Sequence, residues 1–332
     1  MTLLTKIYKD RLECQLCPHY CRLSAGKTGI CGVRKNTGNK IELTTYGVIS
    51  GYALDPIEKK PLYHFFPGYN ILSVGSYGCN MRCDFCQNYH ISQNVPVSLV
   101  PGLTINGIIN ECLKAENNIG LAFTYNEPVI SFEFMRDAAV RANEKNLKTV
   151  MVSNGYINPS PLEEIIGFID AFNIDLKAFD EGFYKKITGS ELEPVKQALK
   201  QISESGRHLE VTTLVIPGMN DDENDMRLQT EWMAGELGRN VPFHLSAYFP
   251  RYKRENPATS DDILVRLSDI ASEKLDYVYT GNTGLSLKQS THCKECGTLV
   301  TIRSGYKTTT LNLNDNGTCA VCGNLVYSNF IF

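Results

Sequence analysis

Residues 73–89 read SVGSYGCNMRCDFCQNY and bring Cys79, Cys83 and Cys86 together in a C-x3-C-x2-C arrangement. The apolar run Ile71–Ser76 overlaps the start of this stretch and predicts a strand, so the three cysteines lie in the loop that follows it. In a four-iron cluster each iron takes one ligand from the protein, so three thiolates would leave one iron open. An open iron lets a cluster bind a second molecule as well as carry electrons. The spacing therefore predicts a reactive iron–sulfur site.

The aromatic residue Phe85 stands just before Cys86 and adds to this pattern. Two other interpretations apply to the same residues. The thiols could hold a zinc ion together with a fourth ligand such as His90, or they could only pack in a core. The position of the loop directly after a strand favours the reactive site.

From residue 71 onward, short apolar or β-rich runs alternate with amphipathic stretches. The expected strands are Ile71–Ser76, Leu121–Phe123, Thr149–Val152, Ala171–Asp175, Leu209–Ile216, Phe243–Tyr248 and Tyr277–Tyr279. The expected helices are Ile105–Glu116, Val129–Asn146, Pro161–Phe168, Val195–Ser205, Asn224–Leu237 and Asp261–Leu275. Repeated strand-then-helix units predict an α/β fold with a parallel sheet, here a partial (β/α)6-type barrel over residues 71–284. The loops after barrel strands form the active site, so the three cysteines would lie in its mouth.

Twelve cysteines in 332 residues are too few for a small disulfide scaffold, yet eleven of them fall into three sets. The chain begins MTLLTKIYKDRLEC, which has no apolar segment of the signal-peptide kind, and it contains no run of about 18 apolar residues. We therefore expect a cytoplasmic protein without a membrane association, in which clustered cysteines favour metal binding over disulfides. The cysteine outside the sets, Cys112, is expected to be a small buried apolar residue.

A four-cysteine set precedes the predicted barrel, in a metal-binding subdomain expected over residues 1–70. Its members are spaced C-x2-C-x3-C-x9-C and are Cys14, Cys17, Cys21 and Cys31. Four thiolates would hold zinc or an iron–sulfur cluster, or less readily a mononuclear iron, and His19 could replace one of them. A strand pair is expected around Lys40–Ala53.

A second four-cysteine set follows the barrel, in residues 285–332. It consists of two C-x2-C pairs separated by 22 residues, each followed by glycine: Cys293, Cys296, Cys319 and Cys322. This pattern predicts a zinc-ribbon-like module with a tetrahedral all-thiolate zinc site, with an iron–sulfur cluster as the alternative. Residues 285–292 are expected to form a linker.

Four longer stretches of the sequence add to the interpretation as an iron–sulfur enzyme: CQLCPHYCRLSAGKTGICGVR, DPIEKKPLYHFFPG, GCNMRCDFCQNYHISQ and FTYNEP. The CxxxCxΦC signature at Cys79–Cys86 resembles that of the radical S-adenosylmethionine (SAM) enzymes. The chain is similar to the activating enzymes of pyruvate formate-lyase type. The longer phrases and the C-terminal C-x2-C pairs resemble the radical SAM member of the AmmeMemoRadiSam system over essentially the whole chain.

The resemblance implies a [4Fe-4S] cluster on the three central cysteines, with SAM chelating the open iron. Reductive cleavage of SAM would give a 5′-deoxyadenosyl radical that abstracts hydrogen from a substrate, an oxidoreductase reaction. The cofactors carry this chemistry, and the protein positions them and excludes water.

The resemblance also implies SAM-contacting residues at the ends of the following strands. The catalytic candidates are Cys79, Cys83, Cys86, Asp175 and Lys177; the cofactor-binding candidates are Phe85, Asn126, Glu127, Ser153, Asn154, Asp175, Lys177 and His244. Asn126 and Glu127 stand where the family commonly has a Gly-Gly-Glu-Pro-like stretch, and here the glycines are absent. Some of these candidates also have a structural alternative: a helix N-cap before Pro128 for Asn126 and Glu127, a turn at Asn154-Gly155, and a structural role for His244. Thr212 and Val215 resemble residues that flank adenine.

The charge distribution bears on the partners. Residues 1–70 contain 10 Lys and Arg against 5 Asp and Glu, but bound thiolates would cancel part of this basicity. A second hypothesis is nevertheless a zinc-ribbon adaptor that binds RNA or protein, with a non-catalytic barrel; a plain electron carrier would need neither an open iron nor a barrel. For the enzyme, the resemblance implies an electron donor such as flavodoxin or ferredoxin, AMMECR-like and MEMO-like companion proteins, and a protein substrate such as a glycyl site. RNA and small molecules remain open as substrates.

Overall fold

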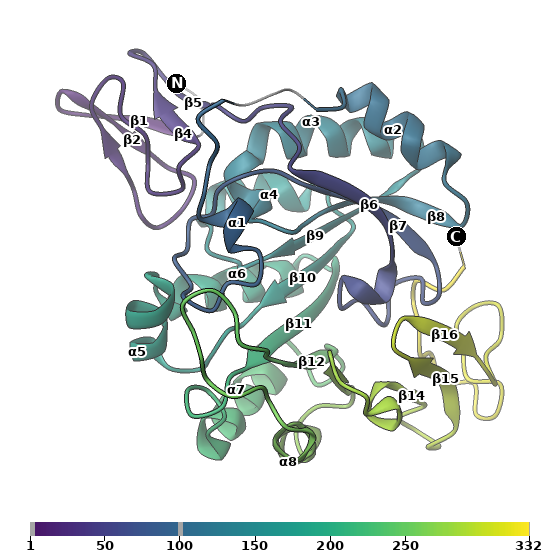
Figure 1. The fold of residues 1–332 in the computed structure, drawn as a ribbon. Coiled ribbons are helices and arrows are strands. Elements are labelled where there is room, and N and C mark those ends of the chain that lie inside the picture. Colours follow the sequence, from purple (N-terminus) through teal and green to yellow (C-terminus); the bar gives the residue numbers. More distant parts are fainter. Residues whose placement is uncertain (1–3, 99–101, 332) are drawn as a thin grey trace.

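The computed structural model describes residues 4–98 and 102–331, and its central element is an eight-stranded sheet (Figure 1). In chain order the strands are β6 (Gly51–Pro56), β7 (Asn70–Gly75), β8 (Asn118–Phe123), β9 (Lys148–Ser153), β10 (Ala171–Asp175), β11 (His208–Val215), β12 (Phe243–Ala247) and β13 (Val278–Gly281). Strands β7 to β13 are parallel and lie side by side in chain order, whereas β6 pairs antiparallel with β7. Because β6 and β13 end the sheet without pairing, the barrel is partial and open.

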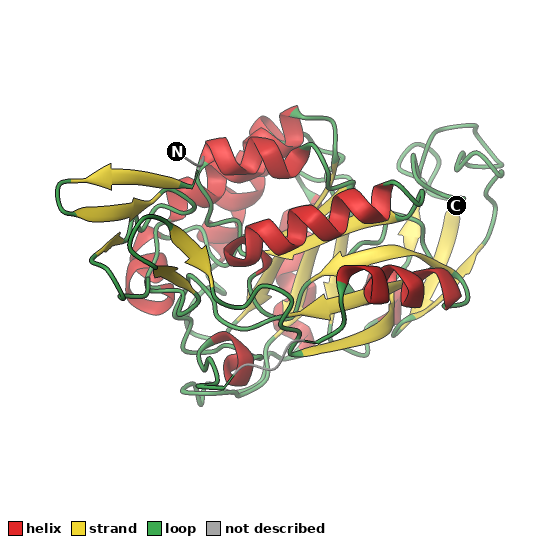
Figure 2. Cartoon of the chain, turned by 90° about the horizontal axis from the view of Figure 1, so that it is seen from above, coloured by secondary structure: helices red, strands yellow, loops and turns green. Residues whose placement is uncertain are grey.

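Helices connect the parallel strands and pack on the outside of the curved sheet (Figure 2). The helical elements between the parallel strands are α1 (Tyr89–Ser92), α2 (Ile105–Lys114), η2 (Pro128–Ser131), α3 (Phe132–Asn143), α4 (Pro159–Ile166), α5 (Glu181–Phe183), η3 (Tyr184–Thr188), α6 (Leu192–Glu204), α7 (Glu223–Glu236) and α8 (Asp261–Ser272). The predicted α/β fold with a partial barrel is confirmed. The helix expected over Val129–Asn146 is divided, because Pro128 starts a 3-10 turn before α3 begins.

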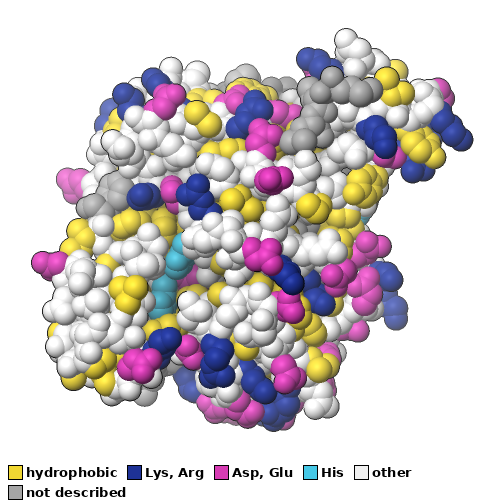
Figure 3. Space-filling view, turned by 180° about the vertical axis from the view of Figure 1, so that it is seen from behind, with side chains coloured by type: hydrophobic (Ala, Val, Ile, Leu, Met, Phe, Trp, Pro, Cys, Tyr) yellow, Lys and Arg dark blue, Asp and Glu magenta, His cyan; other side chains and the backbone are white. Residues whose placement is uncertain are grey.

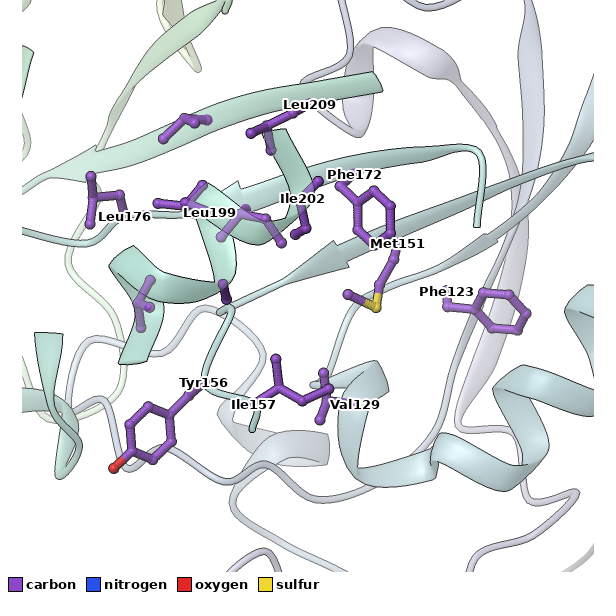
Figure 4. Packing of buried hydrophobic residues seen from close by; sticks show 14 of the residues in the cluster. Phe123, Val129, Met151, Tyr156, Ile157, Phe172, Leu176, Leu199, Ile202 and Leu209 are labelled. Carbon is purple, nitrogen blue, oxygen red and sulfur yellow. The ribbon is translucent and has the colours of Figure 1, made fainter. Parts of the chain in front are cut away.

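The core lies between the sheet and these helices (Figure 4). On β10, Phe172 and Ile174 are fully buried in this core, while Asn173 and Asp175 point to the other face of the sheet. This alternation follows from the two-residue period of a strand. The polar residues of the strands therefore accumulate inside the barrel, where the site is formed.

The N-terminal residues form two small antiparallel sheets beside the barrel (Figure 1). They contain β1 (Thr5–Tyr8), β2 (Arg11–Cys14), β3 (Arg22–Leu23), β4 (Arg34–Asn36) and β5 (Ile41–Leu43). The strand pair expected around Lys40–Ala53 is wrong, because β5 pairs with β4 and β6 pairs with β7 instead. Strand β6 is followed by the 3-10 turn η1 (Ile57–Lys59) and then by β7.

The C-terminal residues form η4 (Ser286–Gln289), β14 (Thr291–His292), β15 (Leu299–Ser304) and β16 (Lys307–Thr310). The stretch expected to be a linker is thus η4 and β14, and β14 pairs with β15. The buried guanidinium of Arg303 donates to the Tyr63 carbonyl and the Thr291 hydroxyl, at 2.7 Å each. The Thr308 hydroxyl donates to Glu58 at 2.7 Å. The bonds to Tyr63 and Glu58 attach the module to the segment that precedes β7.

A buried carboxylate, that of Glu210, organises the interior near the amino ends of the strands. It accepts hydrogen bonds from the backbone N–H groups of Tyr63 and His64, at 3.0 and 2.7 Å. Its other partners are the rings of His208 and His244, at 2.9 and 2.6 Å. These hydrogen bonds hold the pKa of Glu210 well below its ordinary value, although burial alone would raise it. On the opposite side of the molecule from Figure 1, histidine side chains are visible in a narrow groove (Figure 3).

Replacing this carboxylate should destabilise the protein. A Glu210→Gln substitution leaves one amide oxygen and adds an N–H group facing existing donors, so we expect a loss of about 2 to 4 kcal/mol. Thermal unfolding under anaerobic conditions measures it. The control is Glu204→Gln on the exposed face of α6, and equal melting temperatures for the two variants would contradict the role given to Glu210.

Candidate active site

A cavity of about 520 Å³ opens at the carboxyl ends of the parallel strands. A ligand of SAM size suits such a volume. Most of the candidate residues line it: Cys79, Cys83, Phe85, Cys86, Asn126, Glu127, Ser153, Asn154, Asp175, Lys177 and Thr212. These residues come from the loops and ends of five strands, β7 to β11. The topology thus brings together residues that are up to 133 positions apart in the sequence.

The loop after β7 carries the three central thiols. Burial raises the pKa of Cys79 well above its ordinary value and that of Cys83 to about 12. The backbone N–H of Met81 points to the Cys79 sulfur at 3.3 Å, and the Asn154 amide lies 3.7 Å from the same atom. Buried thiols that face donors in a cavity are suited to become thiolates when a metal displaces their protons.

Asn126 braces this loop from β8. Its carbonyl oxygen accepts from the backbone N–H of Ser76 at 2.9 Å, and its amide donates to the carbonyl of Gly78 at 3.0 Å. Gly78 has φ of +87°, and a Cβ there would overlap the carbonyl oxygen of Cys31. The loop is therefore fixed between the end of β8 and the N-terminal cysteine subdomain.

Further contacts join this subdomain to the loop. The His19 ring is hydrogen-bonded to the Asn80 carbonyl at 2.7 Å, and the Arg82 guanidinium contacts the Ile30 carbonyl. On the other side, the Arg82 N–H donates to the Thr188 carbonyl at 2.7 Å. The cysteine loop is thus held from both sides by hydrogen bonds to main-chain carbonyls.

Glu127 is the N-cap of η2, which is the structural role considered for it from the sequence, and it also lines the cavity. Its carboxylate accepts from the N–H of Val129 at 3.0 Å, the Ser153 hydroxyl at 2.7 Å and the N–H of Asn154 at 2.9 Å. Burial raises the pKa of Glu127 to about 7, even though these donors favour its charged form. The carboxylate therefore positions the end of β9.

Asp175 and Lys177 form an ion pair on the cavity wall, with 2.8 Å between the Lys177 Nζ and the Asp175 Oδ2. Burial alone would lower the pKa of Lys177, but Asp175 and the nearby Cys83 raise it above its ordinary value. The lysine thus stays charged beside the thiols. The Asp175 carboxyl is about one-third exposed, which leaves it accessible to a ligand in the cavity.

His244 does not line this cavity. On β12 it lies opposite Thr212 of β11, but its ring contacts Glu210 and packs edge-on against Tyr63, with ring centres 4.7 Å apart. Ser246, two residues further along the strand, reaches the cavity instead. Val215 is buried in the outer core, so of the two adenine candidates only Thr212 faces the cavity.

Sequence reasoning assigned no role to Lys59 and Lys60, which also line the cavity. Both ammonium groups contact Asp55, at 2.8 and 2.7 Å, and Asp55 accepts from the Tyr125 hydroxyl at 2.6 Å. Burial lowers the pKa of Lys60 to about 8. The phrase DPIEKKPLYHFFPG contains these residues, but the resemblance gave no reason to place it beside the cysteines. Their position depends on β6, which pairs with β7 and was not expected.

The outer cysteine sets differ in geometry. In the C-terminal set the sulfur atoms all lie within 4.8 Å of one another, and this is the one group of three or more potential metal ligands so close together in residues 4–98 and 102–331. The N-terminal four line one small cavity with Arg34 and Ile130. The C-terminal group could therefore hold a single metal ion.

The comparisons with known proteins agree with this fold. Residues 73–228 match the model of the Radical SAM superfamily. An uncharacterized protein of Methanocaldococcus jannaschii is 36% identical over 323 residues, which are 96% of each chain. The chain belongs to the radical SAM superfamily and is an enzyme of the radical SAM type, with a [4Fe-4S] cluster and SAM as the cofactors that this domain implies.

The more distant relatives include activating enzymes. The pyruvate formate-lyase-activating enzyme of Clostridium pasteurianum is 24% identical over 155 residues, 45% of this chain and 63% of that enzyme. Among solved structures, a radical SAM methyltransferase from Sphaerobacter thermophilus has a TM-score of 0.52 at 16% identity, with 71% of each chain covered. The latter similarity supports the fold. None of the helices in the described part of the chain is long and apolar enough to cross a membrane.

The close approach at Gly78 leads to a prediction about iron binding. Gly78→Ala would displace the loop from the Cys31 carbonyl, so we expect anaerobically purified protein to lose most of its iron at the central cysteines. Iron analysis and the absorption spectrum measure this loss. Gly206→Ala is the matched control, because Gly206 has φ of +74° and open space around its Cβ position. Iron contents that match in the two variants would contradict the importance of this contact.

Proposed function

We propose that Cys79, Cys83 and Cys86 hold the [4Fe-4S] cluster and that SAM occupies the cavity beside them. When bound, this pair supplies a 5′-deoxyadenosyl radical, formed by reductive cleavage of the SAM sulfonium, that abstracts hydrogen from a substrate. The observation that carries the proposal is that three cysteines, Cys83 buried and Cys79 and Cys86 partly buried, line one cavity of about 520 Å³ at the strand ends.

The donor set fits the cluster. The three thiols share one cavity, but they do not form one of the groups whose ligand atoms all lie within 4.8 Å among the described residues. A single ion would need its ligands closer together, whereas thiolates on separate irons stand further apart. His90, the alternative fourth ligand for zinc, is not among the residues that line the cavity.

Different polar residues of the cavity would bind different groups of SAM. The Lys177 ammonium is suited to the methionyl carboxylate, and the accessible Asp175 carboxylate to the methionyl amine. Glu127 has its oxygens engaged by donors from the chain, so it fixes the positions of Ser153 and Asn154 on the cavity wall.

The similarity to activating enzymes supports a protein as the substrate, with hydrogen taken from a glycyl or other protein site, and a separate reductant protein such as flavodoxin or ferredoxin. AMMECR-like and MEMO-like companions are part of the proposal on the strength of the sequence phrases alone. Deuterium tracked from labelled candidate partners into 5′-deoxyadenosine tests the substrate.

The cleavage itself is tested without knowledge of the substrate. Anaerobic protein supplied with dithionite and SAM should release 5′-deoxyadenosine, measured by chromatography. Cys83→Ser should reduce the release to the level of an enzyme-free sample, whereas Cys112→Ala, which changes the buried cysteine of α2, should retain it. Product release by Cys83→Ser at the unmodified rate would refute the proposal.

Lys177→Met offers a graded test of the SAM site. Loss of one charge-assisted hydrogen bond is worth about 1.5 to 3 kcal/mol, so SAM should bind at least about tenfold more weakly. Equilibrium binding of SAM to the anaerobic protein measures this effect. Lys186→Met, on η3 and outside the cavity lining, is the control, and equal affinities in the two variants would remove Lys177 from the site.

We also propose that the C-terminal cysteines bind structural zinc. The Cys293–Cys322 and Cys296–Cys319 sulfur distances are 3.5 and 3.7 Å. A tetrahedral ion with Zn–S bonds of about 2.3 Å places its sulfurs about 3.8 Å apart. The local core contains few large apolar residues, Val300, Val326 and Tyr327 among them, so its folding would depend on the metal.

Removing this metal should loosen the C-terminal module while leaving the barrel folded. We expect Cys319→Ser to lose about one zinc per chain and to increase hydrogen exchange of residues 291–327, without faster exchange in β8 to β10. Mass-spectrometric exchange and zinc analysis measure both effects. Full zinc retention by this variant would overturn the assignment.

A further inference from the structure

The N-terminal cysteines enclose a site of a different kind from the C-terminal ones. Their thiols line one small cavity whose lining is almost entirely apolar. Cys14, Cys17 and Cys31 are buried, and Cys21 is partly buried. Four cysteine side chains that line one small cavity, without a disulfide between any of them, offer a donor set for a metal centre.

The spacing of these sulfurs argues against a single ion. A tetrahedral zinc ion would place all four sulfurs about 3.8 Å from one another, and the C-terminal sulfurs do all lie within 4.8 Å of one another. The N-terminal cysteines do not meet even a 4.8 Å limit in the part of the chain that the structure describes. They share this wider spacing with the three central cysteines. Thiolates that bind different irons stand further apart because the body of the cluster lies between them.

A buried arginine supplies a second, independent observation. Arg34 is 2% exposed and lines the same cavity as the four thiols. Its two terminal nitrogens donate to Glu133, at 2.7 and 2.8 Å, and to the Ile130 carbonyl at 3.2 Å. The remaining donor, Nε, is buried and has no acceptor among the described residues. A buried N–H group without a partner is costly, so its position beside the thiols indicates that an acceptor belongs there.

We infer that Cys14, Cys17, Cys21 and Cys31 bind a second, polynuclear iron–sulfur cluster, and that the Arg34 Nε donates a hydrogen bond to it. Sulfide and thiolate sulfurs supply the acceptor that Nε lacks, and the guanidinium charge offsets the negative charge of the cluster. Glu133 holds the guanidinium in its orientation through two hydrogen bonds. This site goes beyond the SAM chemistry proposed for the central cysteines.

Metal analysis of the full chain tests the inference. Anaerobically prepared protein should contain about six to eight irons and about one zinc per chain, four of the irons at the central site. About four irons and two zinc ions would overturn the inference but leave the central cluster and SAM cleavage intact. The two proposals can therefore fail separately.

A variant that lacks the central ligands isolates the second cluster. The triple change Cys79→Ser, Cys83→Ser and Cys86→Ser should abolish SAM cleavage yet retain about two to four irons per chain and an iron–sulfur electron paramagnetic resonance signal after reduction. Adding Cys14→Ser and Cys17→Ser should remove both iron and signal. Absence of iron from the triple variant, with unchanged circular dichroism, would overturn the inference.

The role of Arg34 is tested in the triple-variant background by Arg34→Lys, which keeps the charge and an ion pair with Glu133 but removes the Nε donor. Without that hydrogen bond the reduced cluster is less stabilised, so its midpoint potential should shift to more negative values. Arg22→Lys is the control, because the Arg22 side chain is half exposed and pairs with Glu13. Equal potentials in the two variants would exclude the Arg34 hydrogen bond.

Discussion

The interior of the barrel depends on the buried carboxylate of Glu210. Four donors from three parts of the chain converge on it: two N–H groups of the segment before β7, a ring on its own strand and a ring on β12. Along β11, Glu210, Thr212 and Leu214 point to the same side, because strand residues alternate. The carboxylate thus forms a layer nearer the amino end of β11. The cavity that Thr212 and Leu214 line lies further toward the carboxyl end of the strand.

The layers explain which site residues could be predicted. The cysteines, Asn126, Glu127, Asp175 and Lys177 stand in short phrases directly after strands, where parallel topology guarantees that they meet. His244 was misleading because its strand was expected but its height within the barrel was not. One step of the two-residue period separates it from Ser246, which lines the cavity. The position of a residue along the barrel axis depends on the register between neighbouring strands, and this register cannot be determined from a single sequence.

The sequence did not predict that the segment before β7 contributes residues to the cavity, and the reason is again the pairing of strands. Strand β6 pairs antiparallel with β7 over six residues, and this pairing brings Lys59 and Lys60 to the cavity. Its residues alternate weakly, and residues 51–54 are exposed, so no periodic pattern marked them. The outer cysteine sets were visible in the sequence, but their sulfur spacing, which separates a one-ion site from a wider one, exists only in three dimensions.

The contact between Gly78 and the Cys31 carbonyl sets a lower limit on the size of a working fragment. The loop that contains the three central cysteines packs against main-chain atoms more than forty residues upstream, outside the barrel that carries the strands. A barrel cut free at residue 71 would contain all three central cysteines and still lack the surface against which their loop is shaped. The structural unit that shapes the loop of the central cysteines is therefore larger than the barrel itself.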